Sequence, residues 1–143
     1  MLTEILLFVR QNISRCNMVF KLKTSEETAS IFSEIGSSTH LQPFALSKIA
    51  IALSVRDSND LSDSDFATNT DGLELNRQTI TGEFDELFKA LIVQKEQKSL
   101  TDDEYFPKYL KAYIDKGAKL LYAEFKYAGS SFYQHLSHLD KGI

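Results

Sequence analysis

The spacing of apolar and polar residues near the start of the chain predicts one short strand followed by a helix. Apolar and basic side chains alternate over residues 19–23, Val-Phe-Lys-Leu-Lys, which is the period-2 pattern of a half-buried strand. Thr24 is followed three positions later by Glu27, the pattern of a capping box, so a helix should begin there. This helix spans about three turns, and Gly36 is placed to end it with a left-handed cap.

Two further helices are expected in the middle of the chain. Pro43 suits the first turn of a second helix, which should end near Arg56. A third helix follows, with its apolar residues at the spacing of one buried stripe. That stripe consists of Ile80, Phe84, Leu87, Phe88, Leu91 and Ile92.

The fourth predicted helix has one apolar and one basic side. It follows a second capping-box pattern, Thr101 with Glu104, and Pro107 favours a start near Tyr105 or Phe106. Its apolar face consists of Phe106, Tyr109, Leu110, Tyr113, Ile114, Gly117, Leu120 and Leu121. At about 100° per residue, an arc of about 140° opposite that face holds Lys108, Lys111, Lys116, Lys119 and Lys126.

Length and composition indicate a single domain, and the predicted elements make it mainly α. The chain has 143 residues, of which 43% are hydrophobic and 25% charged, as in ordinary globular proteins. A chain of this size buries enough surface to fold without a disulfide, a structural metal or a cofactor. We divide it into an N-terminal extension (1–17), one helical domain (18–128) and a C-terminal tail (129–143).

Targeting signals and cysteine usage point to a cytoplasmic protein. The single cysteine, Cys16, excludes an intrachain disulfide and fits a reducing compartment. The apolar run near the N-terminus is preceded by Glu4 and followed by no small-residue cleavage site, unlike a signal peptide. It is also shorter than the ~20 residues of a membrane-spanning helix. We therefore expect no membrane partner.

Charge is unevenly distributed, although the net charge is only −4. Residues 57–75 are rich in Ser, Asp and Asn and contain an Asp71-Gly72 turn signal, so an acidic loop is predicted. Its six acids are Asp57, Asp60, Asp63, Asp65, Asp71 and Glu74. The acidic total argues against a surface that is wholly a nucleic-acid footprint, so any contact with DNA requires locally clustered lysines.

No motif of a metal site or a catalytic site is complete. With Gly72 as the sixth position of an EF-hand, Ala67 stands first and Gln78 twelfth, where calcium needs acidic ligands. His135 and His138 have helical spacing, but a zinc site needs three or four ligands. The sequence has neither a phosphate-binding GxxxxGK[ST] loop nor a nucleophile elbow, so an enzyme is not expected.

Residues 71–85, DGLELNRQTITGEFD, resemble the most recognisable stretch of DndE proteins, the E component of the bacterial Dnd system of DNA phosphorothioation. The lysine-bearing strand and the two helices before it also resemble the start of that family, so the resemblance covers residues 18–120. The residues of the motif that we interpret as structural are Asp71, Gly72, Asn76, Arg77, Gly82 and Glu83.

The resemblance implies a small α-helical protein that assembles as a homotetramer. It also implies binding to double-stranded DNA, with a preference for nicks, and cooperation with other Dnd proteins. The Dnd system replaces a non-bridging phosphate oxygen with sulfur, and other components activate and deliver that sulfur. The chain is therefore expected to be non-catalytic and to bind no cofactor.

Lysines are the candidate DNA contacts. In ribbon-helix-helix proteins two strands pair across a dimer and enter a DNA groove, which would bring Lys21 and Lys23 to the phosphates. The alternative is a solvated edge strand that lysines protect from aggregation. The fourth helix adds Lys108, Lys111, Lys116 and Lys119, for which the alternative is an ordinary polar face.

Other interpretations stay open. Arg77 is expected to pair with carboxylates near it in sequence, which are Glu74, Glu83 and Asp85, and the alternatives are that it orders the loop or contacts a partner protein. For the whole chain, the first alternative is a scaffold that binds proteins through the acidic loop and never touches DNA. A ribbon-helix-helix repressor would bind one palindromic sequence, and an enzyme would need a perturbed acid or base in a pocket.

Overall fold

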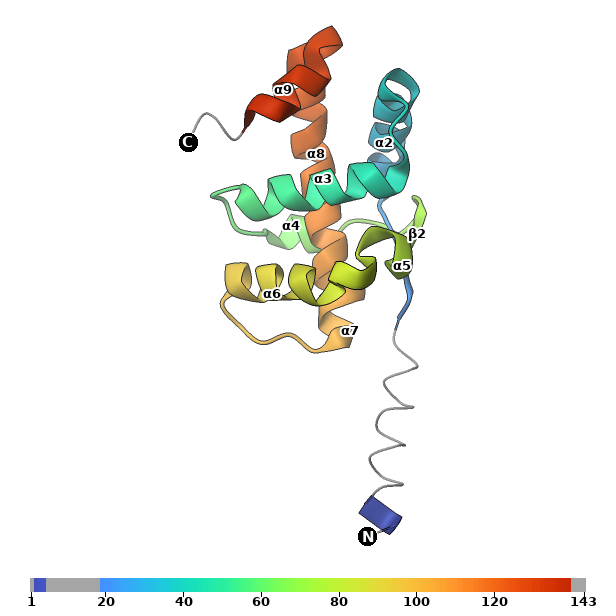
Figure 1. The fold of residues 1–143 in the computed structure, drawn as a ribbon, viewed down its shortest axis with the longest axis vertical. Helices are drawn as coiled ribbons and strands as arrows, with labels where there is room; N and C mark the ends of the chain where they lie inside the picture. Colours follow the sequence, from blue (N-terminus) through green and yellow to red (C-terminus); the bar gives the residue numbers. More distant parts are fainter. Residues whose placement is uncertain (1, 5–18, 140–143) are drawn as a thin grey trace.

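The computed structural model of the protein describes residues 2–4 and 19–139, and it is mainly helical with one small sheet (Figure 1). In chain order, the elements are β1 (Lys21–Lys23), α2 (Glu26–Thr39), α3 (Pro43–Arg56), α4 (Asp63–Phe66), β2 (Glu74–Asn76), α5 (Arg77–Ile80), the 3-10 turn η1 (Gly82–Phe84), α6 (Asp85–Glu96), α7 (Asp102–Glu104), the π-helical turn η2 (Tyr105–Leu110), α8 (Lys111–Ala128), the 3-10 turn η3 (Gly129–Ser131) and α9 (Phe132–His138). The predicted class, mainly α with a short N-terminal strand, is confirmed.

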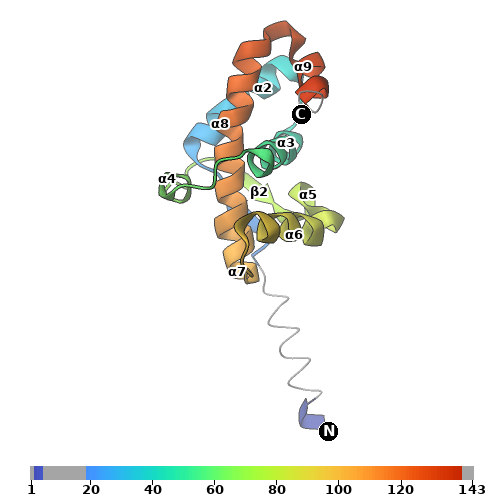
Figure 2. The ribbon, with the colours of Figure 1, turned by 90° about the vertical axis from the view of Figure 1, so that its left-hand side faces the viewer.

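Helix α8 is the central element of the fold. Helices α3, α5 and α6 lie to one side of it and α4 lies to the other (Figure 2). Helix α3 crosses α8 so closely that a Cβ atom added at Gly117 would lie 1.8 Å from the carbonyl oxygen of Ala50. Ile114, Ala118 and Leu121 are buried around this crossing. Only glycine permits such an approach of two backbones.

The first helix is capped one residue later than the capping-box pattern predicted. Ser25, and not Thr24, is the N-cap of α2, and its hydroxyl accepts a hydrogen bond from the Thr28 amide at 3.1 Å. The helix continues past Gly36 to Thr39. Its left-handed cap is His40 (φ 62°), whose amide donates to the Gly36 carbonyl at 2.8 Å. The predicted end at Gly36 was wrong because the helix continues for about one more turn, to Thr39, before the left-handed His40 ends it.

Strand β1 pairs with a second strand of the same chain. It pairs antiparallel with β2, with Lys21 opposite Asn76, Leu22 opposite Leu75 and Lys23 opposite Glu74. The ribbon-helix-helix interpretation had assigned this pairing to a second copy, and that part is wrong. The predicted acidic loop, residues 57–75, is also not wholly a loop, because it contains α4 and the start of β2.

The predicted third helix is interrupted at Gly82. Gly82 has a positive φ of 49°, so the chain turns between α5 and η1 before α6 begins. Of the predicted buried stripe, Ile80 and Ile92 are fully buried. Phe84, Leu87 and Leu91 are instead exposed. The expectation of one continuous buried face is therefore wrong, because the turn rotates α6 relative to α5.

The predicted tail is folded over part of its length. Helix α9 packs against the end of α8, where the buried ring of Phe132 meets that of Phe125 edge-on at 5.3 Å between centroids. The Tyr133 hydroxyl donates a hydrogen bond to the carbonyl of Thr39 at the end of α2. Of the predicted extension, residues 5–17 lie outside the described residues. Among the helices described here, none is long and apolar enough to cross a membrane.

We predict that Gly117→Ala destabilises the protein by about 3 kcal/mol, because the new methyl group meets the backbone of Ala50 and the two helices must separate. Urea denaturation measures the free energy of unfolding. Gly36→Ala is the matched control, since its Cβ would meet one carbonyl oxygen, of Leu41, at 3.1 Å. It should change stability by about 1 kcal/mol or less. Equal effects of the two substitutions would contradict the close crossing.

Candidate nucleic-acid interface

The β1–β2 ribbon presents its basic side chains to solvent. Leu22 and Leu75 form its buried face, while Lys21 and Lys23 are exposed on the other face. The ammonium of Lys21 lies 3.0 Å from Glu74, and both side chains are at least half exposed. The hydrogen bond from Lys21, with a smaller contribution from Lys23, holds the pKa of Glu74 below its usual range. The exposed ribbon face is therefore basic but partly neutralised by one acid.

Backbone hydrogen bonds at both ends fix the position of the ribbon. The Arg77 amide donates to the Phe20 carbonyl at 2.7 Å, and the Thr24 amide donates to the Leu73 carbonyl at 2.9 Å. At Gly72 the chain approaches the first strand so closely that an added Cβ would lie 2.1 Å from the Ser25 carbonyl oxygen. The glycine of the sequence motif therefore lets the loop join the ribbon.

Arg77 connects three parts of the chain through its guanidinium. It donates to Asp85 at 3.1 and 2.6 Å and to Asp102 at 2.9 and 2.7 Å, so both contacts are bidentate. The guanidinium carbon also lies 4.8 Å from the centre of the Phe106 ring. A further bond, at 3.3 Å, reaches the Val19 carbonyl just before β1. Sequence proximity suggested Glu74, Glu83 and Asp85, of which Asp85 is a partner while Glu74 pairs with Lys21, and it could not suggest Asp102, 25 residues away.

The charges of this cluster stabilise each other. Hydrogen bonds to Asp102 and then to Asp85 raise the pKa of Arg77 further above its usual range, although burial acts against it. Burial also disfavours ionisation of Asp85, but hydrogen bonds from Arg77 and Thr81 outweigh it and the pKa of Asp85 lies below its usual value. Burial next to Asp85 raises the pKa of the Tyr105 hydroxyl, which donates to that carboxylate at 3.1 Å. Arg77 and Asp85 are therefore ionised at neutral pH, while the Tyr105 hydroxyl is neutral.

The remaining motif residues shape the chain around Arg77. Asn76 is the N-cap of α5, and its side chain accepts a hydrogen bond from the Gln78 amide at 2.9 Å. The amide of Asp71 donates to Asn69 at 3.2 Å, and Gly82 makes the turn toward α6. Glu83 is exposed at the start of that segment.

A second cluster surrounds Asp115, which sequence reasoning missed. Its carboxylate is 1% exposed and accepts hydrogen bonds from four groups in three segments. The donors are the Ser25 amide (3.1 Å), the Thr28 hydroxyl (2.7 Å), the Thr68 hydroxyl (2.7 Å) and the Lys111 ammonium (2.7 Å). Its spacing of four residues from Lys111 was a signal for an ion pair, but gave no sign that the pair is buried.

The lysines of the fourth predicted helix do not form one open strip. Lys111 is buried against Asp115 and Thr68, and the ammonium of Lys116 lies 3.1 Å from Asp57 with a side chain only 11% exposed. The expected common basic face is therefore wrong at these two positions, because α4 and the loops around it cover this side of α8.

The other lysines of this segment remain accessible. Lys108 is exposed, with its ammonium 5.6 Å from the ring centres of both Phe66 and Tyr109. Lys98, which sequence analysis did not select, lies 4.8 Å from the Tyr109 ring centre. Farther along, the exposed side chains of Lys119 and Lys126 pair with acids of α2, at 3.7 Å to Glu27 and 2.6 Å to Glu34.

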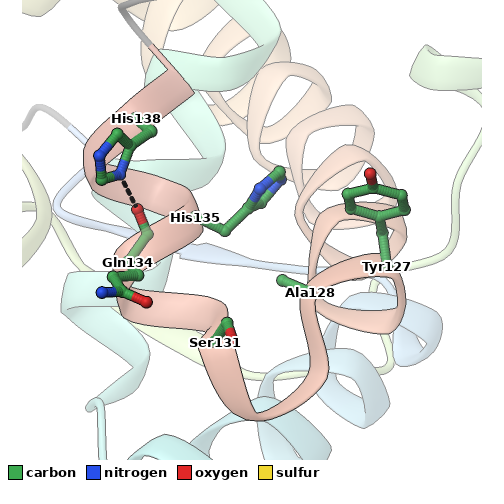
Figure 3. Close-up of a pocket in the computed structure, with 6 residues that line it drawn as sticks. All are labelled: Tyr127, Ala128, Ser131, Gln134, His135 and His138. Carbon is green, nitrogen blue, oxygen red and sulfur yellow. Dashed lines mark hydrogen bonds between the residues drawn. The ribbon is translucent and has the colours of Figure 1, made fainter.

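The two histidines of the tail line a shallow hollow of about 420 Å³ between α8 and α9 (Figure 3). His135 points toward α8, where it hydrogen-bonds Glu124 and its ring centre lies 5.4 Å from that of Tyr127. His138 donates from Nδ1 to the Gln134 carbonyl at 2.6 Å within its own helix. Over residues 2–4 and 19–139, no three His, Cys, Asp or Glu side chains gather as metal ligands. Cys16 lies outside the described residues.

Comparisons with known proteins identify relatives of the fold. The family model of DndE, the DNA sulphur modification protein DndE, matches residues 21–128. A crystal structure of DndE from Escherichia coli B7A, described as involved in DNA phosphorothioation modification, is 18% identical with a TM-score of 0.60. The match covers 73% of this chain and 96% of that chain.

A crystal structure of a doubly substituted DndE mutant is similar at 17% identity and a TM-score of 0.58, covering 72% of this chain and 97% of that chain. No curated protein matches. The folded tail after residue 128 lies beyond the family match.

We predict that Arg77→Met lowers the free energy of unfolding by about 3 kcal/mol at pH 7, because Asp85 and Asp102 then face each other without a cation. The pKa of Asp85 is lowered by folding, so its stabilising contribution is present above pH 4 and is lost as pH falls below about 4. The difference between wild type and variant should therefore shrink between pH 4 and pH 3, in guanidinium titrations at each pH.

Arg77→Lys serves as the matched control for charge. It keeps the cation but loses the paired donors, so its stability at pH 7 should fall between those of wild type and Arg77→Met. A difference between wild type and Arg77→Met that stays constant from pH 7 to pH 3 would refute the coupling to the two carboxylates.

Proposed function

The chain belongs to the DndE family of DNA sulphur modification proteins, and from that premise we propose that it binds double-stranded DNA as a non-catalytic subunit of the phosphorothioation machinery. The observation that carries the proposal is the open face of the β1–β2 ribbon, where Lys21 and Lys23 are exposed on a rigid support. A preference for nicked duplex is part of the proposal and rests on the resemblance of residues 71–85 to the family.

The geometry divides the candidate lysines into two groups. Lys21, Lys23, Lys108 and Lys119 have exposed side chains, so we assign phosphate contacts to them. Such contacts release counterions and need little rearrangement of an exposed ammonium. Lys111 and Lys116 are tied to Asp115 and Asp57, and moving either to DNA would leave an acid without its partner. We therefore assign these two a structural role.

Self-association of the chain would bring together more exposed lysines than one copy carries. With a net charge of −4 and few exposed cations on the ribbon, a single copy offers few phosphate contacts. We propose a homotetramer, in which symmetry repeats the ribbon and extends the basic surface along a duplex. Other Dnd proteins, which carry out the sulfur chemistry, are the proposed protein partners. The proposed location is the cytoplasm, where the machinery meets DNA.

A scaffold that binds proteins alone is the second candidate. It is favoured by the ion pairs that engage exposed lysines, Lys21 with Glu74 and Lys119 with Glu27. Its docking surface would be the acidic stretch 57–75. A ribbon-helix-helix repressor loses its support, because β1 pairs with β2 of the same chain.

We predict that replacing both Lys21 and Lys23 by Ala weakens binding to nicked duplex and lowers the slope of log K against log salt by about 1.8, since each phosphate contact contributes about 0.9. Fluorescence anisotropy at several salt concentrations measures both quantities, on nicked and intact duplex of the same sequence. The double variant Lys48→Ala/Lys126→Ala removes the same charge elsewhere and should leave the slope unchanged. An unchanged slope in the ribbon variant would exclude these contacts and favour the scaffold.

We also predict that Glu74→Gln strengthens binding to DNA by about two- to tenfold at low salt, because it removes the acid that neutralises Lys21 next to the phosphates. The control is Glu34→Gln, which removes a similar acid from Lys126, a lysine outside the proposed contacts. The same anisotropy titration tests both variants. Equal gains in affinity for the two would indicate an effect of net charge alone, and not of the ribbon.

A further inference from the structure

Helix α6 has an apolar side that the described fold does not cover. The side chains of Phe84, Leu87 and Leu91 are 56%, 56% and 40% exposed. The side of the helix about 100° away from Leu91 is anchored in the core by Ile92, which is fully buried. An amphipathic surface helix normally has a polar outer face, so apolar residues there mark an unfilled contact.

The three residues form one continuous patch, which we call the α6 stripe. Positions 84, 87 and 91 are spaced by three and four residues, so their side chains project within an arc of about 60° on the outer side of η1 and α6. The other exposed aromatic residues lie on different segments: Phe20, beside exposed Val19, precedes β1, and Phe44, Tyr127 and Tyr133 lie on α3, α8 and α9. Phe44 lies under the ammonium of Lys48, and Tyr133 donates its hydroxyl to Thr39. Grouped exposed apolar side chains of this kind mark a binding surface.

The charges at the two ends of the stripe have opposite signs. Glu83 and Glu86 are exposed at its N-terminal end. Lys98 is exposed just past its C-terminal end, and Lys95, half-buried at that end, donates to the Asp57 carbonyl at 2.5 Å. A copy of the same helix laid antiparallel would bring each acidic end to a basic end, and would also oppose the two helix dipoles. A parallel copy would place like charges together, and a DNA phosphate would meet the two glutamates.

We infer that the α6 stripe binds the α6 stripe of a second copy of this chain, with the two helices antiparallel about a two-fold axis. Such an interface is isologous, so one face with complementary ends is sufficient to form it. Leucines would pack on leucines near the axis, and Phe84 would reach the C-terminal half of the partner helix. The inference rests on the self-association proposed above and identifies the α6 stripe as a surface through which two copies bind.

The first experiment compares self-association of full-length variants by sedimentation equilibrium. Leu87→Glu places a charge in the stripe, and we expect the dissociation constant of the dimer to rise at least about tenfold. Phe44→Glu is the matched control, because it adds the same charge at an exposed apolar residue outside the stripe. It should leave the dissociation constant unchanged. Both residues are largely exposed, so thermal melts should show that both variants fold.

The second experiment tests the antiparallel arrangement with cysteines in a Cys16→Ser background. Glu83→Cys and Gln94→Cys change residues that are exposed near opposite ends of the stripe and on the same flank of it. Mixed together and oxidised, the two variants should give a heterodimeric disulfide in higher yield than either variant gives alone. Higher yields from the separate variants would show parallel helices and overturn the arrangement.

The outcomes separate this inference from the proposed function. If Leu87→Glu and Phe44→Glu behave alike, the α6 stripe does not bind a second copy. If wild type sediments as a monomer at every soluble concentration, both the stripe interface and the proposed homotetramer are contradicted. Binding of wild type to nicked duplex is measured independently, by anisotropy. Absence of that binding contradicts the proposed function and leaves the result on the stripe intact.

Discussion

The buried carboxylate of Asp115 is the interaction on which the arrangement of the chain depends. A charge taken out of water must be matched by donors, and here they come from the start of α2, from the segment after α4 and from α8 itself. The carboxylate therefore holds the ribbon end of the chain and the acidic segment against the central helix. Arg77 is the corresponding buried cation. It binds Asp85, Asp102 and the backbone just before β1, and so holds these three segments together.

Local patterns predicted the elements that local forces form. The start of α2 is fixed locally by the Ser25 hydroxyl, and Pro43 begins α3 as expected. Strand β2 escaped prediction because its three residues lie inside a polar segment and are stabilised by β1, about 50 residues earlier. The pairing of Asp102 with Arg77 could likewise not be predicted from the sequence, because only the folded chain brings the two residues together.

The candidate site shows a different limit of sequence reasoning. Periodicity finds the polar side of a helix, and the usual inference is that this side faces water. Helix α8 passes through the middle of the fold, so part of its polar side meets other elements, and Lys111 becomes an internal counterion. The ribbon lysines could be located from alternation alone, because a strand with a buried Leu22 must turn its neighbours outward. The apolar spacing in α6 was equally visible, but not the turn at Gly82 that exposes it.

The contact of Gly117 with Ala50 has a mechanical consequence. Where two backbones touch, no side chain is left between them to change rotamer, so α3 and α8 can neither roll nor slide against each other. Helix α8 extends about 27 Å at 1.5 Å per residue and behaves as a stiff rod clamped near its midpoint. Helix α9 is fixed to the end of this rod by the Phe125–Phe132 contact and to α2 by the Tyr133 hydroxyl. Flexing is left to the joints, of which Gly129, with its positive φ, is the one between rod and tail.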